Sequence, residues 1–436
     1  MSEEYLHSVT LDKDLCKGCT NCISHCPTEA IRVRDGKAMI ISNRCIDCGQ
    51  CIRTCPSHAK KAVSDPLDML NKFTFKVALP APSFYAQFKN VPIDTVLTAL
   101  KKFGFDDVYE VASAAEIASL ATAELLEKVK SPRPMISSSC PAVVRLIQVR
   151  FPSLIEHVIK IQTPMEIAAR IVKNQIYPDK RGLGVFFISP CPAKVTSVRV
   201  PLGNEMSAVD GVIAQKDIYP ALRKIIKTID KPEHLSKASS LGIKWGHSDG
   251  ESEAVNSKKS ISVDGIDHVI KVLEQIESED FHHIEFIEAM ACPGGCVGGT
   301  LTVENPFIAR SRLKRYSMAC ENRGIKGSDQ LTEFDIAWTQ EIYSRPVLKL
   351  SENMSEAIKM MDEIEKINDE LPGLDCGSCG APTCHSLAED IVTGKAQKTD
   401  CIFVGWSRAF GSASASQMRK ALSTSASVGM CFEVSL

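Results

Sequence analysis

Long apolar runs, strong net charge and an export signal are all missing from this chain of 436 residues. No apolar stretch reaches the ~18 residues that a membrane-spanning helix needs, so we expect no membrane span. The formal net charge is -2 and the pI is about 6.6, which leaves no general attraction for nucleic acid. The acidic start, residues 1–5, is not followed by a basic segment with an apolar core. The lack of a signal peptide predicts a cytoplasmic protein.

Cysteine, by contrast, is abundant, with 18 residues in the chain. A secreted disulfide protein would be shorter and would carry an export signal. Here the cysteines cluster at the spacings of metal ligands, which indicates thiolate ligation in a reducing compartment. The length of the chain suits two or three domains with a large core.

Two runs of the form C-x2-C-x2-C-x3-C-P follow each other between residues 16 and 56. This repeat is typical of bacterial two-cluster ferredoxins, in which the fourth cysteine of each run ligates the other cluster. A pair of zinc sites is the alternative, but zinc does not require the repeat. We therefore expect residues 1–65 to form an α+β ferredoxin-like domain that carries electrons. Its two [4Fe-4S] clusters would be held by Cys16, Cys19, Cys22 and Cys55, and by Cys45, Cys48, Cys51 and Cys26.

Residues 70–345 alternate between short apolar runs and helical patterns, which predicts an α/β domain. We expect a helix over 94–103 and another that begins at Thr163-Pro164. Ser113-x-x-Glu116 is a capping-box pattern and predicts a helix over 117–129. Strands are expected at 75–79, 107–112, 133–137, 183–189 and 283–289.

Three of these strands lead to cysteines, namely to Cys140, to Cys191, and to the pair Cys292 and Cys296. Ligands of open α/β sheets lie beyond the carboxyl ends of the strands, so the four thiols could converge on one site. Cys140 precedes Pro141 at the start of a helical pattern, where the helix dipole favours a thiolate. The pair lies in a turn almost without side-chain bulk, E-A-M-A-C-P-G-G-C-V-G-G. Scattered buried cysteines that act as small hydrophobic residues are the alternative.

Three segments resemble, in order, the active-site motifs of [FeFe]-hydrogenases: S-S-S-C-P at 137–141, S-P-C-P-A-K at 189–194 and M-A-C-P-G-G-C-V-G-G at 290–299. The segment Ala81-Pro82-Ser83 is also similar, and the resemblance covers most of residues 1–300. It implies an H-cluster, in which a [4Fe-4S] cubane is bridged to a diiron subsite with CO, cyanide and dithiolate ligands. The implied ligands of the cubane are Cys140, Cys191, Cys292 and Cys296.

The same resemblance implies roles for four of the side chains around this cluster. Cys296 would bridge the cubane to the diiron subsite. Lys194 and Ser83 would donate hydrogen bonds to cyanide ligands, and Met290 would pack against the diiron unit as a polarizable wall.

The chain departs from the catalytic members of that family at the proton relay. Ser139 stands where those members have a cysteine, and a hydroxyl donates protons far less readily than a thiol of pKa ~8.5. Glu124 and Glu127 do not replace the family's acidic relay, because we expect them on the outer faces of their helix. The pattern resembles the sensory subgroup, in which turnover is expected to be slow. The other departures are Ser189 and Ser197 in the second motif, and Thr122 and Leu125 near the positions of the relay glutamates.

The C-terminal part begins with an acidic amphipathic helix pattern over 353–370. The spacing C-x2-C-x4-C-x16-C resembles a small [4Fe-4S] domain that also follows the H-cluster domain in the sensory subgroup, and a four-cysteine zinc site is the alternative. We expect a mostly helical domain over 350–405 and a low-complexity tail over 406–436, with no PAS domain. Cys320 is expected to be a buried hydrophobic residue, His385 to be exposed, and Cys431 has no assigned role. The four predicted ligands are Cys376, Cys379, Cys384 and Cys401.

These features predict an enzyme that interconverts hydrogen with protons and electrons, slowly because of Ser139. Electrons would pass through three [4Fe-4S] clusters to a redox partner such as a ferredoxin or another iron–sulfur subunit. One alternative is a hydrogen or redox sensor that signals to a partner protein or within a homodimer. The second is a non-catalytic electron-transfer subunit, which Lys194 and Met290 disfavour because a bare cubane needs neither.

Overall fold

The computed structural model describes residues 7–129, 131–278, 281, 283–320, 336–347 and 349–405. The predicted tail at 406–436, with Cys431, lies outside these residues. The chain divides into two compact units. Unit 1 consists of Met1–Thr10, Ile46–Arg53 and Lys61–Arg345, and unit 2 of Leu11–Cys45, Thr54–Lys60 and Pro346–Leu436. Among the described residues, no helix has both the length and the apolar character needed to cross a bilayer.

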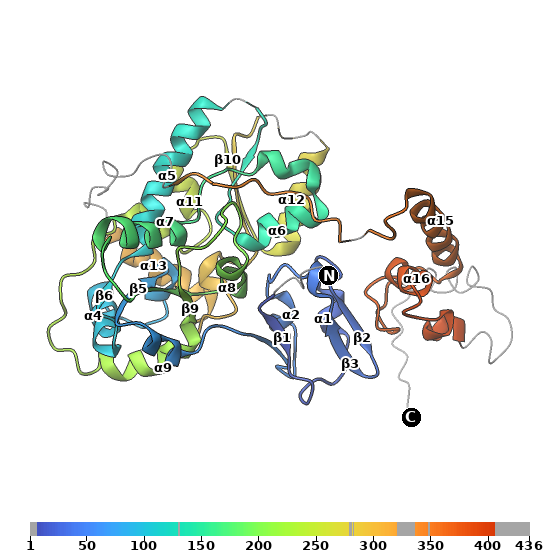
Figure 1. Cartoon of the computed structure of the whole chain (residues 1–436), viewed down its shortest axis with the longest axis horizontal. Coiled ribbons are helices and arrows are strands. Elements are labelled where there is room, and N and C mark those ends of the chain that lie inside the picture. Colours follow the sequence, from blue (N-terminus) through green and yellow to red (C-terminus); the bar gives the residue numbers. More distant parts are fainter. Residues whose placement is uncertain are drawn as a thin grey trace. The chain divides into compact units, whose positions relative to one another are not determined.

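Two parallel sheets form the centre of unit 1, with helices packed around them (Figure 1). The order of the four-stranded sheet is β6-β5-β8-β9 and that of the three-stranded sheet is β10-β11-β7. All the strand pairs in both sheets are parallel. The strands are β5 (Phe75–Pro80), β6 (Asp107–Val108), β7 (Met135–Ile136), β8 (Leu183–Ser189), β9 (Gly211–Ala214), β10 (Ser260–Asp264) and β11 (Phe286–Met290).

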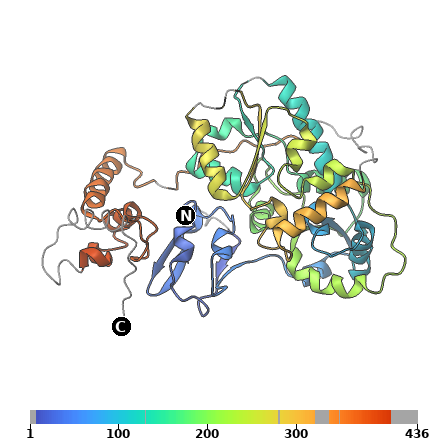
Figure 2. The same cartoon turned by 180° about the vertical axis from the view of Figure 1, so that it is seen from behind.

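The helices of unit 1 follow most of these strands, as expected for crossover connections between parallel strands. One of them, α13, is orange in Figure 2. The helices are α2 (Gln50–Arg53), α3 (Pro82–Tyr85), α4 (Ile93–Phe103), α5 (Val111–Lys128), α6 (Pro141–Arg150), α7 (Pro164–Ile171), α8 (Pro192–Arg199), α9 (Gln215–Ile226), α10 (Ser240–Lys244), α11 (Gly250–Val255), α12 (Ile266–Glu277) and α13 (Pro306–Met318).

Continuous apolar runs explain the buried central strands. Strand β8 is buried from Gly184 to Ser189, and it pairs with β5 from Phe75↔Leu183 to Pro80↔Ile188. A strand between two parallel neighbours is covered on both faces, so both of its faces must be apolar. The parallel pairing brings the carboxyl ends of the strands to the same edge of each sheet.

The strands expected over 133–137 and 283–289 are shifted or shortened to Met135–Ile136 and Phe286–Met290, and the largest error lies at the start of α5. The strand expected over 107–112 ends at Val108, and helix α5 begins at Val111 instead of opening at Ser113. Glu116 therefore lies inside α5, where its buried carboxylate accepts a hydrogen bond from the backbone N–H of Ser239 at 2.5 Å. Glu116 thus takes part in a tertiary contact, which local spacing does not reveal.

Several other expectations are confirmed. Helix α7 follows Thr163 as predicted, α6 begins directly after Cys140, and β8 has the predicted bounds. Glu124 and Glu127 are both exposed, and the Glu124 carboxylate pairs with Lys128 at 2.6 Å. The two glutamates are surface charges, as expected.

Unit 2 contains an antiparallel hairpin and a small helical segment. Strand β2 pairs with β3 from Ile31↔Ile40 to Arg34↔Lys37. Helices α15 and α16 enclose a core that includes Ile364, Ile367 and Leu387. The elements are α1 (Asn21–Ser24), β2 (Ile31–Arg34), β3 (Lys37–Ile40), α15 (Met354–Glu370) and α16 (Cys384–Val392), while β1 (Val9–Leu11) and β4 (Lys60–Ala62) each span a boundary between the units.

Candidate active site

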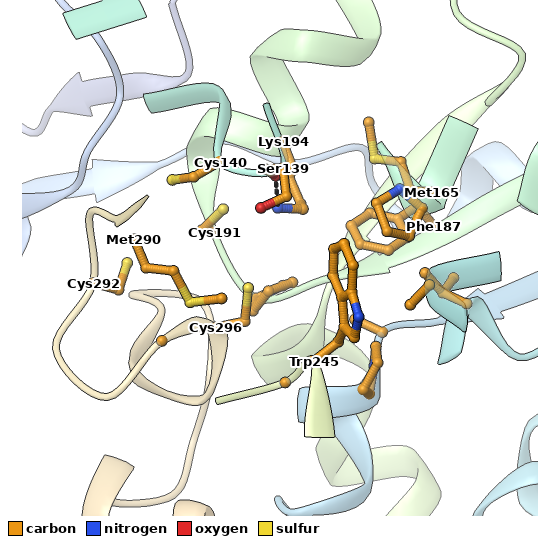
Figure 3. A pocket seen from close by; sticks show the side chains of 18 of the residues that line it. Ser139, Cys140, Met165, Phe187, Cys191, Lys194, Trp245, Met290, Cys292 and Cys296 are labelled. Carbon is orange, nitrogen blue, oxygen red and sulfur yellow. Dashed lines mark hydrogen bonds between the residues drawn. The ribbon is translucent and has the colours of Figure 1, made fainter. Parts of the chain in front are cut away.

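A cavity in unit 1 lies where four parallel strands end. The chain after β5, β7, β8 and β11 supplies most of its wall. In Figure 3 the four thiols and Met290 gather on one side, and Met165, Phe187 and Trp245 lie on the other. The labelled lining residues are Ser139, Cys140, Met165, Phe187, Cys191, Lys194, Trp245, Met290, Cys292 and Cys296.

Two of the thiols occupy equivalent positions at the beginnings of helices. Cys140 is the N-cap of α6 and Cys191 is the N-cap of α8, and each helix starts with a proline. Proline suits the first helical position, and the helix dipole favours negative charge at this end. The S-S-S-C-P and S-P-C-P-A-K segments therefore place both cysteines at helix N-termini, where the helix dipole favours negative charge.

The other two thiols lie in the glycine-rich turn after β11. A Cβ atom at Gly299 would come within 2.1 Å of the Pro190 carbonyl oxygen. At Gly295, where φ is +88°, it would come within 2.5 Å of the Ser248 backbone nitrogen. Glycine is needed at both positions because the turn packs directly against neighbouring backbone. This packing places Cys292 and Cys296 beside the segment that carries Cys191.

The charge balance of the site fits an anionic metal cluster. Burial raises the pKa of Cys191, Cys292 and Cys296 to about 11, and the neighbouring thiolates contribute in the same direction. Such thiols are costly to ionise unless a cation replaces their protons, and soft thiolate ligands select iron–sulfur clusters or zinc. The four sulfur atoms around one cavity therefore fit the cubane that the sequence predicts.

Two basic side chains contact this sulfur set. Lys194 is only 9% exposed; burial alone lowers its pKa, but thiolates at Cys296 and Cys191 outweigh burial and raise it. Its ammonium group donates to the Ser139 carbonyl oxygen at 3.2 Å. Arg53 donates to the Gly298 carbonyl oxygen and to the sulfur of Cys292. A buried ammonium group and an exposed guanidinium group beside the sulfur atoms suit a cluster with net negative charge.

Not all of the predicted site residues face the cavity. Ser83 is fully buried behind Ala81 and Pro82, and its hydroxyl accepts a hydrogen bond from Gln215 Nε2 at 3.0 Å. Ser189 bonds the backbone of Cys191, donating to its carbonyl oxygen at 2.9 Å. The Ser83 hydroxyl thus holds a side chain, the Ser189 hydroxyl holds backbone, and neither lines the cavity.

A buried carboxylate reaches Ser139 from another part of the chain. The Ser139 hydroxyl donates to Glu251 Oε2 at 2.9 Å, and Ser137 Oγ lies 2.8 Å from both carboxylate oxygens. Ser139 lines the cavity, and Glu251, on α11, is 3% exposed. The hydroxyl at the predicted relay position is thus bonded to an acid–base group.

A second buried carboxylate continues from Glu251 toward the edge of the sheet. Glu288 on β11 is fully buried and accepts from the Ser252 backbone N–H at 2.8 Å. The hydroxyl of the half-buried Ser262 on β10 lies 3.2 Å from the same Glu288 oxygen. Burial raises the pKa of Glu251 to about 7, and burial together with the charge of Glu251 raises that of Glu288 to about 8. Both groups can therefore exchange protons near neutral pH.

Sequence reasoning did not find this pair. Glu251 lies 112 residues from Ser139 along the chain and belongs to no motif. Glu288 offered a signal, because a charged residue stands within the apolar run of a predicted buried strand. The residues suggested as alignment equivalents of the family's relay, Thr122 and Leu125, lie on α5 and carry no acid–base group.

Unit 2 contains cysteines with donors already directed at sulfur. Cys16 and Cys26 accept backbone N–H groups from Ala38 at 3.4 Å and Ala30 at 3.2 Å. Lys60 is 3% exposed, and among the described residues its ammonium group has no hydrogen-bond partner. Burial raises the pKa of the nearby Cys22, and Lys60 opposes that rise. A buried cation beside thiols fits an anionic [4Fe-4S] cluster, whose potential depends on such hydrogen bonds and charges.

The C-terminal cysteines also lie together in unit 2. Burial raises the pKa of Cys379, and the nearby sulfur atoms of Cys401 and Cys376 contribute to the shift. Cys384 begins α16 and packs against the same apolar core as Cys379. As expected, His385 is exposed, and Cys320 is a buried residue of the unit 1 core.

Comparison with known protein families agrees with these features. The family described as "Iron only hydrogenase large subunit, C-terminal domain" matches residues 74–258 and 233–300, which together span just over half of the chain. A "4Fe-4S dicluster domain" matches residues 8–56. A family named FeS matches residues 371–403. The chain is thus an iron–sulfur protein with an α/β domain and an N-terminal ferredoxin-like domain.

Similar individual proteins include two hydrogenases. Iron hydrogenase 1 of Clostridium pasteurianum is 25% identical over 377 residues, which cover 68% of this chain and 65% of the relative, just under two thirds of its length. The periplasmic [Fe] hydrogenase large subunit of Nitratidesulfovibrio vulgaris is 26% identical over 396 residues, covering 73% of this chain and 94% of the relative. A cytosolic Fe-S cluster assembly factor, a NAR1 homolog of Schizosaccharomyces japonicus, is 29% identical over 103 residues, 22% of this chain and 20% of the relative.

Proposed function

This chain belongs to the iron-only hydrogenase large subunit family, and we propose that it binds hydrogen and interconverts it with protons and electrons at an H-cluster. The observation that carries the proposal is the convergence of Cys140, Cys191, Cys292 and Cys296 on one cavity beside Lys194. Under this proposal the four thiolates hold the cubane, and Cys296 also holds the diiron subsite. When bound, the cluster supplies the iron that takes up hydrogen and a bridging base that accepts a proton.

The residues of the cavity prepare the site for that chemistry. Lys194 offers a buried ammonium group to an anionic ligand such as cyanide. Met290, Phe187 and Trp245 keep the space apolar, so that water is excluded and the charges act in a medium of low polarity. Ser83, which is bonded to Gln215, supports this wall from behind.

Protons move between the cavity and the outside through the hydroxyl–carboxylate series. Ser139 passes a proton to or from Glu251, and Glu288 and Ser262 extend the route toward the outer edge of β10. A hydroxyl relays a proton only when it receives another one in the same event, because its own pKa is far from neutral. This requirement makes slow turnover the expected outcome.

Electrons travel through the [4Fe-4S] clusters of the N-terminal cysteine repeat. Within unit 1, Cys48 packs against the same apolar cluster as Cys140 and Cys191. The clusters would be held by the two predicted ligand sets of the repeat, and a third cluster by the four C-terminal cysteines over 350–405. A ferredoxin or another iron–sulfur subunit in the cytoplasm would be the redox partner.

A hydrogen sensor is the second candidate, and the serine at position 139 favours it. A barrier raised by ~4 kcal/mol slows turnover about a thousandfold while leaving hydrogen binding possible. The redox state would then be read by a signalling partner. A non-catalytic electron-transfer role is disfavoured by Lys194 and Met290, which a bare cubane does not need.

Infrared spectroscopy of the matured protein tests the proposal. Bands from CO and cyanide are expected, and their absence would exclude both the enzyme and the sensor. Where the bands are present, a comparison of the hydrogen turnover rates of wild type and Ser139→Cys separates the enzyme from the sensor. We expect a clear gain in Ser139→Cys, and an unchanged rate would show that proton supply at this position does not limit turnover.

A further inference from the structure

The C-terminal cysteine segment is joined to the N-terminal cysteine module by buried ion pairs within unit 2. Arg32 Nε and Arg34 Nη2 both donate to Asp390 Oδ2, at 2.7 Å and 2.6 Å. The Arg44 guanidinium group meets both oxygens of Glu389, with Nη1 3.3 Å from Oε2. Arg32 and Asp390 are only 3% and 5% exposed. Three arginines around β2 thus hold two adjacent acids of α16.

Backbone contacts strengthen this junction. The Val33 N–H of β2 donates to the Gly380 carbonyl oxygen at 2.8 Å, and Arg34 Nη1 donates to the Cys379 carbonyl oxygen at 2.9 Å. A Cβ atom at Gly380 would lie 1.9 Å from the Val33 carbonyl oxygen, so only glycine allows the approach. The loop that carries Cys379 therefore lies directly on the free edge of the β2–β3 hairpin.

The same junction brings two cysteine sets together. Gly377, the neighbour of Cys376, packs closely against two residues. A Cβ atom added at Gly377 would lie 3.3 Å from Ile23 Cδ1 and 3.7 Å from Ser24 Oγ. Both contacted residues belong to α1, which also carries Cys22. The C-terminal set thus lies beside the helix that carries Cys22. The predicted set of Cys16, Cys19, Cys22 and Cys55 lies wholly in unit 2, whereas the other predicted set is divided between the units.

The chemistry of the junction indicates a fixed orientation. Buried charges are costly to desolvate and are retained where geometry and hydrogen bonds satisfy them. Forked arginine–carboxylate pairs also define direction as well as distance. A linker that only tethered the C-terminal segment would need none of these contacts.

We propose that this arginine–acid junction holds the C-terminal cluster site as the direct electron-transfer partner of the Cys16, Cys19, Cys22 and Cys55 site. The step is the transfer of one electron, in which a reduced [4Fe-4S] cluster at one site is oxidised and an oxidised cluster at the other is reduced. No bond forms or breaks, and no proton is required. The inference rests on the iron–sulfur part of the proposed function and not on its hydrogen chemistry.

Electron paramagnetic resonance of the full chain tests the proposal. The protein is produced without the diiron subsite, its [4Fe-4S] sites are filled, and it is fully reduced with dithionite. Wild type is expected to show magnetic coupling between the two clusters, seen as line broadening and faster spin relaxation beyond those of Cys376→Ala combined with Cys384→Ala, which retains only the coupling within the N-terminal module. Glu389→Arg, which places like charges opposite Arg44, is expected to lose this coupling at unchanged iron content.

Matched variants complete the experiment. Arg44→Glu combined with Glu389→Arg reverses the pair and is expected to restore the coupling. Glu370→Arg breaks an exposed ion pair with Lys398 in the same unit, and this variant should show the same magnetic coupling as wild type. If Glu389→Arg takes up less iron, Arg34→Glu repeats the comparison from the other side of the junction.

Coupling that persists in the disrupted variants, or that is absent from filled wild type, would overturn the proposal. Since no infrared band enters this test, its result is independent of whether the H-cluster assembles.

Discussion

Glu251 touches Ser139 from a helix that the sequence motifs do not include. At the scale of single residues, this contact is the first step of the proposed proton route. We predict that Glu251→Gln lowers hydrogen turnover by roughly 10²–10⁴-fold, because the amide keeps the hydrogen bonds but cannot exchange a proton at neutral pH. The carbon monoxide and cyanide bands should remain. Glu253→Gln, at an exposed position of the same helix, is the control. A variant of Glu251 with wild-type turnover would place the proton route elsewhere.

The buried pair also makes stability depend on pH. Both folded pKa values are raised, Glu251 to about 7 and Glu288 to about 8, whereas an unfolded glutamate titrates near ~4.3. Between pH ~5 and ~8 the unfolded chain therefore binds fewer protons than the folded chain, and the free energy of unfolding falls as pH rises. We predict a loss on the order of 6 kcal/mol across this range, because each glutamate contributes about 1.4 kcal/mol per pH unit while it is protonated in the folded chain alone.

Apparent melting temperatures between pH 6 and pH 8.5 check this prediction. Glu251→Gln combined with Glu288→Gln should flatten the dependence, since the amides do not ionise. Glu124→Gln combined with Glu127→Gln changes two exposed carboxylates and should leave the slope as in wild type. Equal slopes in all three proteins would show that the buried pair is not the source.

At the scale of elements, the turn after β11 is the most tightly packed part of the site. We predict that Gly299→Ala displaces the Pro190–Cys191 segment, because its methyl group would meet the Pro190 carbonyl oxygen at 2.1 Å. The cubane iron of the site should be lost, as measured by iron analysis and by its resonance signal. Gly294→Ala is the matched control, since its methyl group meets only atoms 3.8 Å or more away. The Gly294→Ala protein should retain its iron, and its free energy of unfolding should fall by about 1 kcal/mol because alanine disfavours the left-handed backbone conformation.

Elements were predictable where the pattern is local. The apolar run of β8 and the Thr163-Pro164 start of α7 could be read directly from the sequence. The start of α5 could not be predicted in this way, because the Glu116 carboxylate accepts a hydrogen bond from Ser239, more than 100 residues away. The predicted thiols converge because they follow parallel strands, which is a rule of the fold. The contact between Ser139 and Glu251 depends on tertiary packing alone, so no spacing indicated it.

At the scale of the whole molecule, the number of cysteine sets predicts the iron content. Four cubanes and a diiron subsite would hold about 18 iron atoms per chain. We predict that Cys376→Ala combined with Cys384→Ala removes about four of them and leaves the infrared bands unchanged. Iron and zinc analysis checks this, and Cys320→Ala, at a cysteine of the apolar core, serves as control. Zinc in wild type that disappears in the double variant would identify the C-terminal set as a zinc site.

The serine at position 139 also affects how the molecule withstands oxidants. A thiol there could be converted stepwise to sulfenic and then irreversible sulfinic acid. In the proposed route, Ser139 and Glu251 offer only hydroxyl and carboxylate oxygens, which have no such oxidation states. Oxidation at the proposed metal site is therefore expected to leave these oxygens unchanged. If the cluster is lost to air, we expect the chain to be refilled without repair of Ser139 or Glu251.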